Sequence, residues 1–133
     1  IALPAVDHAR SLRIYVCWVD ADYEVGILIA PVIFVENWKK IYHELIIYLY
    51  ENLSKKTREK IFFEIIFMTY SYVHNAINKE AFPNSIDIYD KDKMTGRGRG
   101  KYMYKLDYRK EGETFFREEL KKYFHNNKIW YIV

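Results

Sequence analysis

The sequence predicts an α/β protein in which strands and helices alternate, followed by a hairpin, a helix and a last strand. Two short, almost entirely apolar runs, at 25–30 and 61–68, are typical of strands that are buried on both faces. A helical pattern follows each of these runs. This order is characteristic of β/α units around a parallel sheet. The chain has 133 residues, half of them hydrophobic, which is enough for about one folded domain.

Apolar periodicity and helix-stop residues set the elements of the first part. Pro31 closes the first strand, and Asn37 is a suitable N-cap because apolar residues recur every three or four positions after it. Pro83 stops the second helix, which Thr69 or Ser71 caps. The expected elements are a strand at 25–30, a helix from 37 to about 54, a strand at 61–68 and a helix ending near 82. The segment RIYVCWV at 13–19 is also typical of a strand.

The pattern changes after Pro83 and predicts a smaller second part. Its expected elements are a short strand at 86–89, a basic glycine-rich turn, a strand at 101–105, a helix at 113–124 and a strand at 128–133. Because two strands flank the glycine-rich turn, we expect them to pair as a hairpin with a long, positive tip. The chain therefore divides into residues 1–83 and residues 84–133.

The predicted parallel sheet is too small to stand alone. A complete barrel needs about eight β/α units, and this sequence supplies two or three parallel strands. The strand at 25–30 would be left with an apolar, exposed edge. We therefore expect further strands upstream, and a first residue Ile1 instead of Met agrees with a piece of a longer protein.

Positive charge is concentrated between Asp90 and Lys110. Eight basic and three acidic side chains lie there, so this segment has a net charge of +5 while the remaining residues sum to −2. Glycines in GRGRG at 96–100 allow close backbone approach to a ligand, but a strand follows in place of the helix that phosphate-binding motifs require. The pattern predicts a nucleic-acid contact or, equally, a solvated basic loop. The DNA-binding candidates are Lys93, Arg97, Arg99, Lys101 and Tyr102.

The residues of this chain predict no catalytic or metal site. The single cysteine, Cys17, excludes a disulfide framework and any multi-cysteine zinc or iron–sulfur site built by this chain alone. The four histidines lack metal-ligand spacing and are expected on the surface. Glu64, inside an apolar strand, favours a structural ion pair over a catalytic acid. Without a membrane-spanning run or a signal-peptide pattern, we expect a cytoplasmic protein with no membrane partner.

Several blocks, in order along residues 21–133, resemble the C-terminal part of the spore photoproduct lyase family. They are GILIAPVIFVENWKKIYHEL, FEII, Phe82-Pro83, GRGRGKYMY and LKKYFHNNKIWYIV. The family consists of radical S-adenosylmethionine (radical SAM) enzymes that repair DNA. The resemblance implies a partial TIM-like radical SAM barrel. Residues 1–83 would supply its final β/α units and residues 84–133 a C-terminal extension with the hairpin.

The resemblance also implies a function. The chain would contribute barrel closure and DNA grip to a carbon–carbon lyase that acts on the spore photoproduct, a thymine dimer. In that reaction a 5′-deoxyadenosyl radical takes a hydrogen from the dimer, the bridging bond is cleaved and a hydrogen is returned. The full-length protein would use S-adenosylmethionine and a [4Fe-4S] cluster, neither bound by this chain alone, since the family's cluster cysteines lie upstream.

Two residues acquire implied roles from the resemblance. Ala30, in the family's Ile-Ala-Pro strand end, would lie against S-adenosylmethionine. Arg97 would lie next to the flipped thymine dimer. The expected partners are DNA containing thymine dimers and the upstream part of the same protein.

Two alternatives stay open. One is a stand-alone nucleic-acid-binding module without catalysis. The other is a radical SAM enzyme acting on another substrate, because the tyrosine that accompanies the arginine in the family's hairpin has no counterpart here. A CxxxCxxC run in the upstream reading frame favours an enzyme, and a natural start codon just before Ile1 favours the module.

Overall fold

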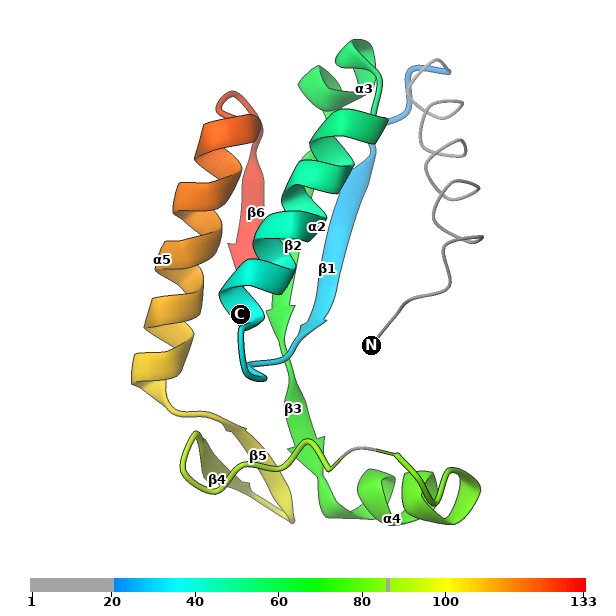
Figure 1. The fold of residues 1–133 in the computed structure, drawn as a ribbon, viewed down its shortest axis with the longest axis vertical. Coiled ribbons are helices and arrows are strands. Elements are labelled where there is room, and N and C mark those ends of the chain that lie inside the picture. Colours follow the sequence, from blue (N-terminus) through cyan, green and yellow to red (C-terminus); the bar gives the residue numbers. More distant parts are fainter. Residues whose placement is uncertain (1–20, 86) are drawn as a thin grey trace.

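Two small sheets, placed end to end, form the framework of the molecule (Figure 1). The computed structural model describes residues 21–85 and 87–133. The first sheet is parallel, in the order β1-β2-β6, and the second is antiparallel, in the order β3-β5-β4. The strands are β1 (Gly26–Val32), β2 (Phe62–Phe67), β3 (Thr69–Ser71), β4 (Met94–Gly98), β5 (Lys101–Tyr104) and β6 (Ile129–Ile132). Since only Met68 separates β2 from β3, one stretch of chain supplies a strand to each sheet.

The helices α2 (Trp38–Asn52) and α5 (Leu106–Tyr123) cover one face of the parallel sheet, side by side (Figure 1). Tyr42 of α2 packs edge-on against Phe116 of α5, with ring centroids 5.3 Å apart. Fully or nearly fully buried side chains fill the space between helices and sheet: Ile46, Leu49, Phe63, Ile65, Phe116 and Leu120. The short helix α3 (Lys55–Lys60) leads into β2, and α4 (Tyr72–Ala81) extends from β3 at the far end of the molecule.

The parallel β/α arrangement is confirmed. The expectation that both faces of β1 and β2 are buried is wrong for the described residues. Burial alternates along β1 and β2, and Leu28 is 55% exposed. The reason is that α2 and α5 cover one face only. The opposite face presents Leu28 and Glu64, and Phe62 stacks there on Trp130 with ring centroids 4.0 Å apart.

The boundaries of the first part differ from the prediction in small ways. Pro31 does not end β1, which continues to Val32. Asn37 does precede α2, but its side chain makes no capping hydrogen bond. Its φ of 61° is a left-handed conformation, which asparagine adopts more readily than most residues. The separate helix α3 starts after Ser54, whose hydroxyl accepts a hydrogen bond from the Thr57 N–H.

The hairpin exists, but its first strand was misplaced. Described residues 87–89 form no strand, and β4 lies inside the segment that was expected to be a long turn. Arg99 and Gly100 alone form the turn, with φ 54° and 68°. Positive φ at both central residues is the conformation of a two-residue type I′ turn, so the strands must pair right up to it. The tip is consequently short.

Helix α5 begins seven residues before the predicted start at 113, because Gly112 and a run of charged residues hide its pattern. Gly112 is buried where a Cβ would lie 2.7 Å from Phe34 Cζ and 2.7 Å from Phe67 Cε1. The glycine therefore permits the close approach of α5 to the two rings. The final strand, predicted at 128–133, is confirmed as β6, which pairs with β2.

Gly112→Ala is expected to destabilise the fold by about 1–3 kcal/mol, because overpacking against two rings exceeds the gain in helix propensity. Urea unfolding measures the change. Gly96→Ala is the matched control, since the nearest atom to its Cβ would be a Tyr102 ring carbon at 3.8 Å. Equal stability of the Gly112→Ala variant and the parent chain would contradict the packing described here.

An ion-pair network around Glu119 joins the two long helices, in addition to the ion pair between Lys39 of α2 and Glu111 of α5. His43 Nδ1 of α2 lies 2.7 Å from the Glu119 carboxylate of α5, which also bonds the Lys122 ammonium. Burial raises the pKa of the Glu119 carboxyl, but the hydrogen bonds from Lys122 and His43 lower it by more. The pKa of Glu119 therefore lies below its usual value. His43, which was expected on the surface, thus bonds to a neighbouring helix.

Glu119→Gln should reduce stability at neutral pH by about 1 kcal/mol, since it removes the charge from these hydrogen bonds. The folded pKa lies below the unfolded value of about 4.3, so this contribution is present above that pH and disappears as pH falls through the folded value. Thermal unfolding measured from pH 7 to pH 3 tests the direction of this pH dependence. The difference between variant and parent should shrink on acidification, and a constant difference would contradict the assignment.

Several expectations fall outside the described part of the chain. The strand at 13–19 and the packing role of Cys17 lie in residues 1–20. Within residues 21–85 and 87–133, no helix has the length and hydropathy needed to cross a membrane.

Candidate nucleic-acid interface and cavity

A cavity of about 450 Å³ opens at the carboxyl ends of β1 and β2. Parallel β/α folds place their ligand sites at this edge because the strand ends and following loops converge there. Ala30, the cofactor candidate, is one of its lining residues and is solvent-exposed. The lining residues come from β1, β2, β3 and α4, with Ile33 just after β1, Met68 between β2 and β3, and Ile88 from the loop that follows α4.

The β4–β5 hairpin lies at the same end of the molecule as the cavity (Figure 1). A register irregularity between Gly96 and Gly98 places Arg97 in a bulge, and Arg99 occupies the first position of the turn. A left-handed backbone favours Gly or Asn, so an arginine there costs conformational energy that the fold does not require.

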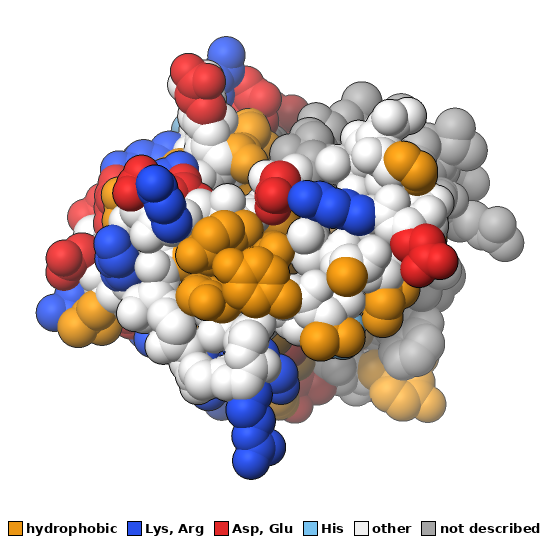
Figure 2. Space-filling view, turned by 90° about the horizontal axis from the view of Figure 1, so that it is seen from below, with side chains coloured by type: hydrophobic (Ala, Val, Ile, Leu, Met, Phe, Trp, Pro, Cys, Tyr) orange, Lys and Arg blue, Asp and Glu red, His pale blue; other side chains and the backbone are white. Residues whose placement is uncertain are grey.

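Three of the five DNA-binding candidates share this hairpin and are unpaired. Arg97, Arg99 and Lys101 are exposed, and none forms an ion pair or a side-chain hydrogen bond with another described residue. Figure 2, which views this end of the molecule, shows a central patch of hydrophobic side chains with both basic and acidic side chains around it. The hairpin thus presents cations to solvent without internal neutralisation.

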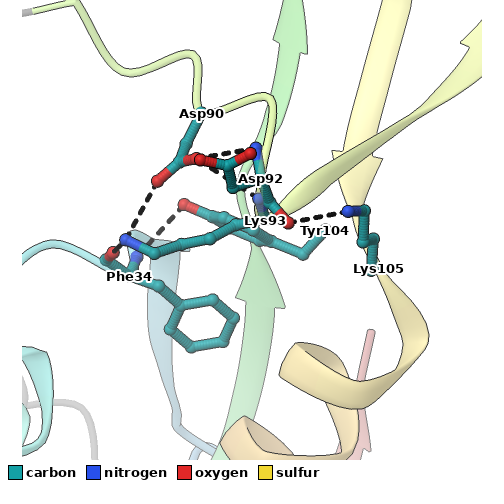
Figure 3. Close-up of polar contacts among 6 residues, drawn as sticks. All are labelled: Phe34, Asp90, Asp92, Lys93, Tyr104 and Lys105. Carbon is teal, nitrogen blue, oxygen red and sulfur yellow. Dashed lines mark hydrogen bonds and ion pairs between the residues drawn. The ribbon is translucent and has the colours of Figure 1, made fainter.

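The Lys93 side chain, unlike those of Arg97, Arg99 and Lys101, is bonded within the protein (Figure 3). Its ammonium donates a hydrogen bond to the Phe34 carbonyl at 2.9 Å and lies 3.0 Å from the Asp90 carboxylate. The bond from Lys93 is the main cause that lowers the pKa of Asp90, and two backbone N–H groups add to it. Tyr104 completes the link, since its hydroxyl accepts the Phe34 N–H at 3.1 Å. These bonds fasten the hairpin to the loop after β1.

Lys93→Met is expected to lower stability by about 1 kcal/mol, because the Phe34 carbonyl loses its charged donor. It should leave the salt dependence of DNA binding unchanged, since the ammonium is already bonded to the Phe34 carbonyl and the Asp90 carboxylate. Urea unfolding and binding at several salt concentrations measure the two effects. A flatter salt dependence at unchanged stability would instead assign Lys93 to the DNA contact.

Tyr102 belongs to a cluster of four tyrosines that joins the hairpin to the cavity. Its ring lies 6.2 Å from that of Tyr70, 5.3 Å from that of Tyr72 and 5.1 Å from that of Tyr89, between centroids. The hydrogen bond with the Tyr72 hydroxyl raises the pKa of Tyr102, and burial raises the pKa of Tyr70. Tyr70 also lines the cavity. The cluster therefore fixes the hairpin relative to the cavity.

The structural ion pair expected for Glu64 is wrong, and the site contains groups that the sequence analysis did not predict. Glu64 bonds the Tyr131 hydroxyl, which lies opposite it on β6, and among the described residues it forms no ion pair. The tyrosine cluster and the α4 wall of the cavity were not predicted. Alternating Tyr70 and Tyr72 beside a strand was a usable signal for the cluster, whereas nothing in the sequence indicated the wall.

In the part of the chain that the structure describes, no group of three or more His, Cys, Asp or Glu side chains could hold a metal ion. The fold and the position of its cavity define the chain as a parallel β/α protein with its candidate ligand site at the carboxyl ends of the strands. The family model of spore photoproduct lyase matches residues 10–133. The chain belongs to the spore photoproduct lyase family.

Individual relatives agree with this membership. The chain is 35% identical over 120 residues to a spore photoproduct lyase of Clostridium acetobutylicum, covering 86% of this chain and 34% of that protein. Two solved structures of spore photoproduct lyase superpose with a TM-score of 0.82 at 24% identity. One is a mutant with bound AdoMet and dinucleoside spore photoproduct, and the other is complexed with dinucleoside spore photoproduct. Each match covers 92% of this chain and 37% of the solved chain, and this likeness establishes the fold.

Proposed function

We propose that this chain closes the barrel and grips DNA in a radical SAM lyase that repairs the spore photoproduct. The observation that carries the proposal is the unpaired basic hairpin next to a cavity at the carboxyl ends of parallel strands. Family membership supplies the reaction class. The chain spans about a third of the length of the curated relative, so the whole activity would need residues beyond it.

The sheet itself supports a role in a barrel. Among the described residues, β1 pairs only with β2, and the face away from α2 and α5 carries apolar side chains such as Leu28. A barrel interior is filled by side chains of this kind, while its helices cover the outside. Residues 1–83 would then form the final β/α units, and residues 84–133 the extension, which returns β6 to the same sheet.

The cavity fits part of a bound S-adenosylmethionine. Its volume lies in the range of small-molecule sites, and the small side chain of Ala30 leaves room against the strand end. Together with a [4Fe-4S] cluster, the cofactor supplies the 5′-deoxyadenosyl radical. A cluster needs three or four thiolates, and the sequence contains only Cys17, so other residues would hold it. This chain's role at the cofactor is to bind and position it through the Ala30 wall.

The hairpin supports the DNA contact. Arginine at a left-handed turn position is unfavourable for the fold, and residues held in such conformations concentrate at functional sites. Arg97, Arg99 and Lys101 would bind backbone phosphates, with Arg97 nearest the flipped base. Tyr102 would hold the hairpin in place through the tyrosine cluster, and Lys93 through Phe34 and Asp90.

One observation favours a second candidate, a nucleic-acid-binding module without catalysis. The chain contains a single cysteine and carries its candidate contacts on one hairpin. The reading frame upstream of Ile1 separates the candidates. A CxxxCxxC run there supports the lyase, and a start codon immediately before Ile1 supports the module.

The activity assay uses the complete reading-frame product, that is, the full-length protein encoded by the whole reading frame that contains this sequence. The protein is reconstituted anaerobically with iron and sulfide. With S-adenosylmethionine and a reductant, it should convert dinucleoside spore photoproduct to thymidylyl-thymidine. The same protein without reductant is the control. DNA binding without conversion by a fully reconstituted protein would favour the module, and absence of both would overturn the proposal.

A further inference from the structure

Helix α4 places polar side chains beside the cavity and apolar side chains in solvent, and none of its residues is buried in the part of the chain that the structure describes. Val73 and Ile77 are 66% and 57% exposed among the described residues. The cavity is lined by the polar residues His74, Asn75 and Asn78 of α4 and by its N-cap Ser71, and of these His74 and Asn78 are also exposed. An ordinary surface helix buries its apolar stripe and exposes its polar one. Packing within the described chain therefore gives no reason for this orientation.

The cavity-facing side chains form one continuous strip on the helix. His74 and Asn78 are four residues apart on α4 and share one face, with Asn75 beside them, and Ser71 precedes the helix as its N-cap and as the last residue of β3. His74, Asn75 and Asn78 make no side-chain hydrogen bond or ion pair with any described residue. Asn75 is half-buried, and its side-chain amide stays accessible for hydrogen bonds with a ligand.

The opposite wall of the cavity has a different chemistry. It is lined by apolar side chains of the strand ends and the loop after α4, namely Ile33, Ile66, Met68 and Ile88. The ligand that fits such a site is planar, apolar on its faces and rich in alternating donors and acceptors along its edge. Carboxamides are the side chains that make paired hydrogen bonds to such edges, as Asn does with nucleobases.

We infer that His74, Asn75 and Asn78 form a nucleobase-recognition strip that selects the ligand of this cavity. Asn75 and Asn78 bind the donor–acceptor edge of the base, and His74 supplies a further donor or acceptor. This assignment rests on the proposed function, which offers two sources of the same chemistry: a thymine of the DNA substrate and the adenine of S-adenosylmethionine. The strip deepens that proposal by naming residues that determine specificity.

The test measures binding of three probes to the complete reading-frame product by titration calorimetry. The probes are thymidylyl-thymidine, its analogue without bases, and S-adenosylhomocysteine. The double variant Asn75→Ala with Asn78→Ala keeps an exposed helix that alanine favours, so loss of folding is not expected. Asn126→Ala is the matched control, because this exposed asparagine lies in the turn before β6, at the other end of the parallel sheet.

The double variant should lose about tenfold in affinity for one base-containing probe, since the loss of a good base-edge pair weakens binding by roughly this factor or more. Weaker thymidylyl-thymidine binding with unchanged binding of the base-free analogue assigns the strip to the DNA base. Weaker S-adenosylhomocysteine binding assigns it to the cofactor's adenine. Affinities for both within twofold of the parent protein overturn the inference. If the hairpin cations still control DNA binding in that case, the proposed function stands and only the strip is wrong.

Discussion

Replacing Arg97 and Lys101 by alanine and Arg99 by asparagine is expected to weaken duplex DNA binding about a hundredfold at about 0.15 M salt. Each lost phosphate contact reduces the slope of log K against log salt by roughly 0.9, so three contacts flatten it by roughly 2.7. Asparagine is chosen for position 99 because it tolerates the positive φ of the turn. The hairpin is therefore retained while its charge is removed.

Binding isotherms at four or more salt concentrations measure the affinity and the slope together. Lys55→Ala with Lys121→Ala removes exposed cations elsewhere, on α3 and the last turn of α5, and should leave the slope nearly unchanged. Arg97→Ala alone should reduce the preference for lesion-containing over undamaged duplex, whereas Lys101→Ala should weaken both about equally. Unchanged slope and preference in all hairpin variants would make the segment a solvated loop.

Phe34→Ala is expected to have the largest effect on stability, about 3–5 kcal/mol, because it removes a buried ring and leaves a cavity. The ring lies 4.7 Å from Trp38, 5.4 Å from Phe67 and 4.5 Å from Tyr104, between centroids. It therefore connects α2, the parallel sheet and the hairpin strand β5. Loss of the ring should loosen the hairpin as well as the core.

Urea unfolding followed by tryptophan fluorescence measures the loss, and amide hydrogen exchange in 94–104 measures the hairpin. Phe34→Leu retains most of the buried volume and should cost markedly less. A small effect of Phe34→Ala, or a large loss with unchanged exchange in the hairpin, would contradict the role of this ring as the link between the two sheets.

The parallel part of the fold was predictable because its signals are local. Apolar runs marked β1 and β2, and helical periodicity marked α2, since each element buries its own side chains against a neighbour. The long, open sheet face was not predictable from the same runs. An apolar strand has the same composition whether one or both faces are covered, so Leu28 gave no indication that it would be exposed.

The hairpin was predicted less well because non-local contacts decide its register. Met94 is buried opposite Tyr104, and a type I′ turn at Arg99 and Gly100 requires the strands to pair up to that point. Charge alone grouped Lys93 with the hairpin cations, although its ammonium lies against Phe34 and Asp90. Local composition reports how many cations a segment has, and only the fold reports which of them are already bonded.

Hydrogen exchange of the complete reading-frame product, with and without a thymine-rich duplex, tests the central claim that DNA contacts the end of the molecule carrying the hairpin. Amides of β4, β5 and the first turns of α4 should exchange more slowly when DNA is bound. Those of the exposed faces of α2 and α5 should not change. Protection confined to α2 and α5, with none in 94–104, would contradict the account.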